Sequence, residues 1–355
     1  MTLHSTASRW MTRKLANLTR ALAFGTLAAG ASFALAGAPA QAASSHTLTL
    51  YSAQHGQLVK LLVADFQKMS GATMRVHSGE GPEIASQLIA EGTHSPADVY
   101  FTENSPELML LEEKGLLAKI DASTLKQIPD RYSSPEGRWI GVVARENVLA
   151  YNPSMIKAAQ LPASLLDLAK SAWKEKVAIA PADGDFLPLV SAVAALKGHD
   201  AALNWLKGLK ANAKIYDDDE GVVAAVNSGA VATGIVNNYY WARLHAEMGD
   251  KGTHSTIHHF IHGDVGALVN VSGAAVLKTA PDPALAQKFV AYLVSRRAQE
   301  LMAKSKIDFE YPLRPGVAPD PLLKPFKQLQ PPKLTMQQLG DDSQAGALLR
   351  EAGLL

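Results

Sequence analysis

Three extended segments near the start of the chain alternate with helical segments, and this alternation restricts the possible folds more than any other feature. Alternating or continuous apolar residues typical of strands occur at residues 46–51, 74–78 and 97–102. Apolar residues at helical spacing follow each of them, at 58–69, 82–89 and 106–117. Strands that alternate with helices predict a parallel sheet with helices on both faces. We therefore expect an α/β fold.

A second series of strands and helices begins near residues 148–153, where the chain is expected to be extended before Pro153. Further strands are expected at 177–180, 230–236, 258–261 and 273–277, the last of which is expected to return to the first unit. Helices are expected at 186–196, 201–211, 221–228, 241–248 and 283–303. Ligands of open α/β sheets bind outside the carboxyl ends of the strands, so two such units facing each other predict a cleft between two lobes.

The N-terminal segment 1–42 has the three parts of a secretory signal peptide. A basic part contains Arg9, Arg13, Lys14 and Arg20, an apolar part covers 21–35, and Ala40-Gln41-Ala42 is a typical cleavage site. A retained membrane anchor is a weaker alternative, because small residues precede the predicted cut. We therefore expect export to the periplasm, with 1–42 removed.

Charge and cysteine content exclude several classes of protein. The signal segment holds four of the 34 basic residues and none of the 33 acidic ones, so the mature chain has a formal charge of −3, which gives no support for nucleic-acid binding. The chain has no cysteine, which excludes disulfides, thiolate metal sites and a lipid-modified N-terminal cysteine. Its 355 residues suffice for two packed domains.

Two adjacent tyrosines, Tyr239 and Tyr240, lie where a predicted strand meets a predicted helix. Neighbouring side chains diverge within a regular strand or helix, so an irregular junction is the place where two phenols can reach one point. A pair of phenolates suits a hard cation such as ferric iron, whose charge must displace phenol protons of pKa about 10. The alternative is a pair of amphipathic aromatics in a surface loop.

Four segments of the chain resemble the ferric-ion-binding proteins of bacterial ABC importers. They are Tyr51-Ser-Ala-Gln-His55, Asp98-Val-Tyr-Phe-Thr-Glu103, Asn237-Asn-Tyr-Tyr-Trp241 and the glycine-bounded segment 263–273. The similarity runs through essentially the whole mature chain. It implies a two-lobed type II periplasmic binding fold, in which each lobe is a mixed sheet flanked by helices and the ligand cleft lies between the lobes. We expect 43–145 and 270–320 to form the first lobe, and 146–269 and 321–355 to form the second.

The resemblance also implies a ferric-iron site, with an exogenous anion or water in the remaining coordination positions. The ligands that it implies are His55, Glu103, Tyr239 and Tyr240. Each has an alternative local role: His55 could be a helix-start histidine and Glu103 a charge partner of a helix N-terminus. Asn237 and Asn238 could hydrogen-bond the phenolates or the anion, or simply serve turn chemistry.

The loop Asp183-Gly184-Asp185 departs from the family pattern. It lies where a strand leads into a helix N-terminus, which is a natural anion site, and relatives that use phosphate have small neutral residues there. Asp219 also stands where relatives often have Asn, and three carboxylates would disfavour phosphate. Either water, a carboxylate of the protein or another anion takes its place, or an aspartate caps the helix and points away. Arg145 is a candidate anion partner, with surface solvation as its alternative.

A run of histidines at 254, 258, 259 and 262 could bind zinc, copper or nickel. In a strand, His258 and His262 would share a face and His259 would point away, which favours an incidental role. Glu80 and Glu83 flank Pro82 near the expected mouth of the cleft, where first-turn helix charges are favoured over the alternative of ligands.

The leading functional hypothesis is a binding protein that delivers ferric iron to an inner-membrane ABC permease and its ATPase, acting as a monomer and not as an enzyme. The alternative within the same fold is another solute, such as chelated iron, an organic anion or a polyamine. A non-haem iron oxygenase or a hydrolase has no supporting motif, because neither Gly-x-Ser-x-Gly nor His-Glu-x-x-His occurs.

Overall fold

The computed structural model describes residues 46–355. The predicted signal peptide therefore lies outside the described residues. Within the described part, none of the helices combines the length and apolar character that a bilayer span requires.

One mixed sheet organises the described chain, in the order β2-β1-β3-β9-β4-β7-β5-β6, with β8 and β10 added alongside β4. Its strands are β1 (Thr47–Ala53), β2 (Thr73–Ser78), β3 (Val99–Thr102), β4 (Trp139–Tyr151), β5 (Val177–Ile179), β6 (Ala213–Ile215), β7 (Thr233–Asn237), β8 (Thr256–His258), β9 (Val269–Val276) and β10 (Tyr311–Pro312). The parallel pairings join β1 to β2 and β3, and β5 to β6 and β7. They confirm the parallel arrangement expected from strand–helix alternation, whereas every pairing of β4 and β9 is antiparallel.

The helices follow the strands as the sequence predicts, with small shifts at their ends. They are α1 (Gly56–Ser70), α2 (Gly81–Glu91), α3 (Ser105–Glu113), α4 (Ala122–Leu125), α5 (Phe186–Lys197), α6 (His199–Asn212), α7 (Asp219–Ser228), α8 (Asn238–Gly252), α9 (Pro283–Leu293), α10 (Arg296–Lys304), α11 (Met336–Leu339) and α12 (Ser343–Ala352). Gly71 ends α1 in the left-handed conformation at φ 73°, which glycine adopts without steric cost. The helical pattern expected over 283–303 is two helices, because Ser295 begins a new one and accepts a hydrogen bond from the backbone N–H of Ala298.

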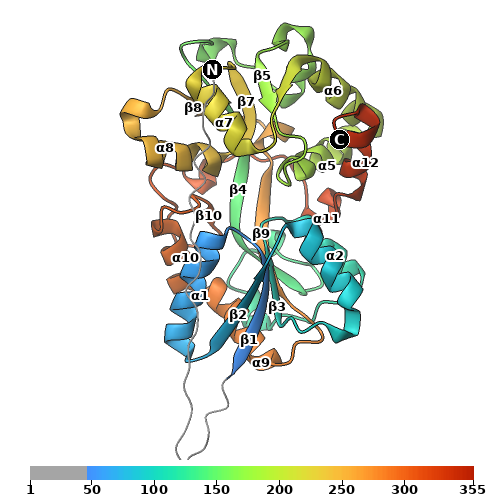
Figure 1. The fold of residues 1–355 in the computed structure, drawn as a ribbon, viewed down its shortest axis with the longest axis vertical. Helices are drawn as coiled ribbons and strands as arrows, with labels where there is room; N and C mark the ends of the chain where they lie inside the picture. The colour runs from blue at the N-terminus through green and yellow to red at the C-terminus, as the bar shows by residue number, and fades with distance from the viewer. Residues whose placement is uncertain (1–45) are drawn as a thin grey trace, which may run out of the picture. The chain divides into compact units, whose positions relative to one another are not determined.

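Strand β4 connects the two halves of the sheet. Its residues 139–146 pair with β9 and residues 147–151 pair with β7, so one 13-residue strand belongs to both halves (Figure 1). The sequence predicted an extended segment only from 148 onward. Both faces of β4 are buried along nearly its whole length. A strand of this kind lacks the alternation of polar and apolar residues by which a strand is predicted from sequence.

The expected strand at 258–261 is wrong in position, because β8 ends at His258. His262 lies beyond it with φ 59°, so the shared face predicted for His258 and His262 does not exist. Instead, His259 Nδ1 lies 2.7 Å from the Oε2 atom of the fully buried Glu146. The histidine run is therefore divided among separate environments, and its incidental role stays a prediction.

Candidate functional site

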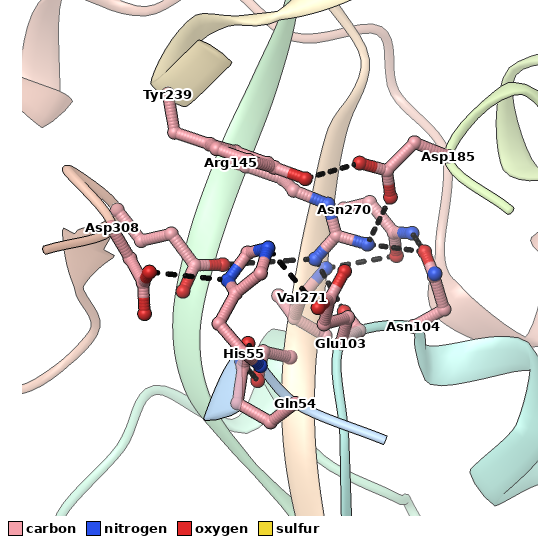
Figure 2. Close-up of polar contacts among 12 residues, drawn as sticks. Gln54, His55, Glu103, Asn104, Arg145, Asp185, Tyr239, Asn270, Val271 and Asp308 are labelled. Atoms are coloured by element: carbon pink, nitrogen blue, oxygen red, sulfur yellow. Dashed lines mark hydrogen bonds and ion pairs between the residues drawn. The ribbon is translucent and has the colours of Figure 1, made fainter. Parts of the chain in front are cut away.

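Four strand ends bring the predicted site residues together. His55 follows β1, Glu103 follows β3, Asp183 and Asp185 follow β5, and Tyr239 follows β7. Within each half of the sheet these strands run parallel, so their carboxyl ends lie at the same edge. Figure 2 shows side chains from all four strand ends converging there. The expected position directly after the strands is confirmed for these residues, with Tyr239 already in the first turn of α8, whereas their role as ligands stays a prediction.

The tyrosine pair occupies the first turn of α8, immediately after β7 ends at Asn237. The junction is confirmed, although both residues are helical and not in an irregular segment. Their rings nevertheless lie together, with centroids 4.1 Å apart and planes at 30°. Tyr239 is fully buried and Tyr240 nearly so. The alternative of two aromatics in a surface loop is therefore excluded.

Both phenols are held protonated by their surroundings. Burial raises the pKa of Tyr239 well above its usual value, and the negative charge of Asp185 raises it further. Burial and the neighbouring carboxylates of Asp185, Asp219 and Asp183 act on the pKa of Tyr240 in the same direction. A phenolate at either position therefore requires a cation to displace the proton.

His55 and Glu103 approach the phenols from the other half of the sheet. The Nε2 atom of His55 lies 3.1 Å from Oε1 of Glu103, and the imidazole meets the ring of Tyr239 edge to face at 5.0 Å between centroids. Burial lowers the pKa of His55, but Asp308, Glu103 and Glu310 outweigh it and raise that pKa to about 9. Burial raises the pKa of Glu103 to about 7. His55 thus contacts two of the other implied iron ligands, and the fourth, Tyr240, packs on Tyr239.

Arg145 lies at the centre of the site, fully buried, so surface solvation does not apply to it. Its guanidinium forms an ion pair with Asp185 at 3.0 Å and donates to the backbone oxygen of Glu103 and the side-chain oxygen of Asn104 (Figure 2). The other Asp185 oxygen accepts a hydrogen bond from the Tyr239 hydroxyl at 2.8 Å. Burial raises the pKa of Asp185, but the charge of Arg145 and hydrogen bonds from Tyr239 and Asn237 outweigh burial and lower that pKa below its usual value. Asp185 therefore links Arg145 to the phenol.

Carboxylates of the protein occupy the loop around Gly184, which the sequence predicts as an anion site. Asp185 stands at the N-cap position of α5 but makes no capping hydrogen bond. Asp183 instead accepts hydrogen bonds from the backbone N–H groups of Asp185 at 3.0 Å and Asp219 at 3.1 Å. Burial and the charge of Asp185 raise the pKa of Asp183 to about 6, and burial raises the pKa of Asp219 well above its usual value. A carboxylate of the protein thus accepts from one backbone N–H group at the start of each of the helices α5 and α7.

Two acidic residues of the C-terminal segment reach the site, and the sequence patterns did not identify them. Asp308 Oδ1 lies 3.3 Å from Nδ1 of His55, and Glu310 Oε1 lies 3.8 Å from Arg145 Nη1. Both are buried, and burial raises the pKa of Glu310 to about 8. The only local signal is an acid on either side of Phe309 just before β10.

A cavity of about 340 Å³ opens beside these groups. Among its described lining residues, His55 and Tyr240 stand with seven carboxylates, namely Glu80, Glu103, Glu107, Asp183, Asp217, Asp218 and Glu220. Glu80, at the N-cap of α2, lies in this lining, in agreement with its expected place near the mouth of the cleft. The excess of acidic side chains makes the electrostatic environment of the cavity favourable for a cation.

The fold and this polar cleft define a class. A mixed α/β sheet with a ligand cleft at the strand ends is the type II periplasmic solute-binding architecture, and solved structures confirm it. Iron-bound HitA from Pseudomonas aeruginosa matches with a TM-score of 0.83 and 43% identity, covering 87% of this chain and 99% of that one.

Sequence comparison gives the family. The model of the bacterial extracellular solute-binding proteins matches residues 62–331, and the chain belongs to that family. It is 41% identical to the Fe(3+)-binding periplasmic protein of Serratia marcescens, over 89% of this chain and 93% of that protein. It is 34% identical to the major ferric iron-binding protein of Neisseria meningitidis serogroup B, over 86% and 93% respectively. These relatives are named as binding proteins.

Proposed function

We propose that this chain is a periplasmic binding protein that captures ferric iron with Tyr239, Tyr240, His55 and Glu103. The observation that carries the proposal is the buried tyrosine pair, which packs against His55 beside a cavity lined by acids. Two phenolates and one carboxylate carry three negative charges, which match the charge of the ferric ion. Oxygen donors favour such a hard cation over soft ones.

The anion loop supports a site completed by water or by the protein, and not by phosphate. Asp183, Asp185 and Asp219 surround Gly184, and Arg145 is already paired with Asp185. A phosphate here would meet three carboxylates and find no unpaired cation among the described residues of the loop. We propose that the three aspartates, Arg145 and Asn237 surround the iron ligands without binding the ion. There they orient the Tyr239 hydroxyl and balance the charge of the site.

Capture and delivery follow from the two-lobed fold. We propose that 43–145 and 270–320 form one lobe and that 146–269 and 321–355 form the other, with β4 and β9 as the connection. Packing of α12 on α5 and α6, within one apolar core, supports the second grouping. The lobes close on the ion, and the loaded monomer delivers it to an inner-membrane ABC permease driven by its ATPase. The protein binds its cargo and does not transform it. Release follows cleft opening, protonation of a phenolate, or reduction to ferrous iron, which phenolates hold less well.

Spectroscopy with metal analysis tests the proposal. The mature protein loaded with ferric citrate and desalted should retain one iron and show a phenolate-to-iron charge-transfer band in the visible. The Tyr239→Phe/Tyr240→Phe variant should lose the band and the iron. Added phosphate should leave the band of the wild-type protein unchanged. Retention of iron by the double variant would refute the assignment.

The seven carboxylates of the cavity also favour a second candidate, an organic cation such as a polyamine. In that case the tyrosines would stack on the ligand, and binding would persist in protein freed of metal by a chelator. Calorimetric titration of metal-free protein with spermidine separates the two functions, because a ferric site predicts no heat of binding.

A further inference from the structure

The side of His55 that faces away from Glu103 contains a second group of polar atoms. There His55 Nδ1 lies 3.3 Å from Asp308 Oδ1, and one ligand atom from each of His55, Asp308 and Glu310 lies within 4.8 Å of the others. Figure 2 shows Asp308 on the opposite side of the imidazole from Glu103. This group is contributed by the loop after β1 and by the segment that leads into β10.

Four atoms of this group are buried and form no hydrogen bond, although Asp308 Oδ1 forms an ion pair with His55. Asp308 and Glu310 are more than nine-tenths buried, at 4% and 6% exposure. Among the described residues, no hydrogen bond reaches His55 Nδ1, Asp308 Oδ2 or either oxygen of Glu310. Arg145 stands 3.8 Å from Glu310, too far for a hydrogen bond, and is shared with Asp185. Buried acids left in this state cost free energy, which a bound cation would recover.

We propose that His55, Asp308 and Glu310 form a second metal site, for a divalent first-row transition ion. One imidazole and two carboxylates are typical ligands for zinc and for its neighbours, and two carboxylates balance a charge of two. Ligands around such an ion lie roughly 3–4 Å from one another, so the side chains need to close by about an ångström. No phenol takes part, and the site is therefore chemically distinct from the ferric site.

The two sites share His55 and cannot both use it as neutral imidazole. Nε2 serves the ferric side and Nδ1 the divalent side, and a neutral ring has one lone pair for a metal. Divalent and ferric ions are therefore expected to compete, although they use different carboxylates. The divalent site does not depend on the proposed ferric function, except for this competition.

Titration of metal-free mature protein with Co²⁺ and Zn²⁺ tests the proposal, with Mg²⁺ as the control ion. Calorimetry should give one site for Co²⁺ and for Zn²⁺ and none for Mg²⁺. The variant Asp308→Asn/Glu310→Gln should bind Co²⁺ at least about tenfold more weakly than the wild type. Tyr239→Phe/Tyr240→Phe should lose the ferric band and keep the Co²⁺ affinity of the wild type. Added Zn²⁺ should lower the apparent ferric affinity of the wild type only.

A charge-matched control removes two surface acids, Asp200→Asn/Glu351→Gln, and should bind both metals like the wild type. Thermal unfolding of each variant shows whether it is folded, and the single variants Asp308→Asn and Glu310→Gln serve if the double variant is not. Equal Co²⁺ binding by the wild type and the Asp308/Glu310 variants would overturn the proposal. Loss of Co²⁺ binding in the tyrosine variant would overturn it as well, whereas failure of the ferric band alone would count only against the proposed function.

Discussion

Replacing Tyr239 by Phe removes one hydroxyl that the structure uses in two ways. In the metal-free protein that hydroxyl donates a 2.8 Å hydrogen bond to Asp185, whose other oxygen pairs with Arg145. In the loaded protein the same oxygen is the proposed phenolate ligand. The ring itself stays, so contacts of the aromatic face with His55 and Tyr240 are kept. The substitution therefore separates the polar contribution from the packing.

The two effects have different magnitudes. Loss of the donor removes a hydrogen bond to the buried carboxylate of Asp185, which lowers the free energy of unfolding of the metal-free protein by about 1–3 kcal/mol. Mutations beside metal ligands weaken binding about 10- to 100-fold, so loss of a ligand should weaken ferric binding at least about 100-fold. Tyr240→Phe is the matched control. Of the two tyrosines of the site, only Tyr239 donates a hydrogen bond to a carboxylate among the described residues. Tyr240→Phe should therefore weaken iron binding with a smaller loss of stability.

Urea unfolding of the metal-free proteins measures the first effect, and competition with citrate, followed at the charge-transfer band, measures the second. The reasoning fails if Tyr239→Phe is as stable as Tyr240→Phe, because Asp185 would then not depend on the phenol. It also fails if Tyr239→Phe retains the ferric affinity of the wild type.

Three further predictions concern the scaffold of the site. Arg145→Met should lower the free energy of unfolding by about 3–5 kcal/mol in urea titrations, because it leaves the buried carboxylate of Asp185 without its cation. Burial raises the pKa of Glu107 to about 8, so the folded protein keeps a proton that the unfolded chain loses. The free energy of unfolding of the wild type should therefore fall by up to about 1.4 kcal/mol per pH unit as the pH rises from about 4.5 to 8. Glu107→Gln cannot ionise, and its free energy of unfolding, measured across the same range, should fall less. Gly234→Ala should cost about 1–3 kcal/mol, seen as a lower urea midpoint, because its Cβ would lie 2.4 Å from a methyl of Val222.

Each of these has a control within the chain. Adding Asp185→Asn to Arg145→Met should restore part of the lost stability, and no recovery would contradict the ion-pair argument. Equal pH slopes for Glu107→Gln and the wild type would show that Glu107 is already ionised in the folded state. Gly56→Ala places a Cβ with nothing within 4 Å and should be at least as stable as the wild type.

The sequence by itself determined most of the helices, five of the strands and the strand ends that carry the site. Alternation of period-two and helical patterns predicted β1 to β3, β5 and β7 with the helices that follow them, because these patterns depend on residues close in the chain. It also placed His55, Glu103 and the tyrosine pair after strands. Strand topology predicted that ligand-binding loops lie at the carboxyl ends of the strands in each half, whereas the combination of these four residues in one site came from the resemblance to the ferric-ion-binding proteins.

Only the tertiary structure decided which charges meet. Arg145 pairs with Asp185, a carboxylate of the loop after β5, because β4 carries the arginine into the middle of the sheet. Asp308 comes from near the other end of the described chain and reaches His55 because β10 pairs with β4. His259 finds Glu146 for the same reason, through the pairing of β8 with β4. Local patterns record which face of an element is apolar, but the partner of a buried charge is set by strands that pair over long distances in the chain, and no short-range periodicity carries that information.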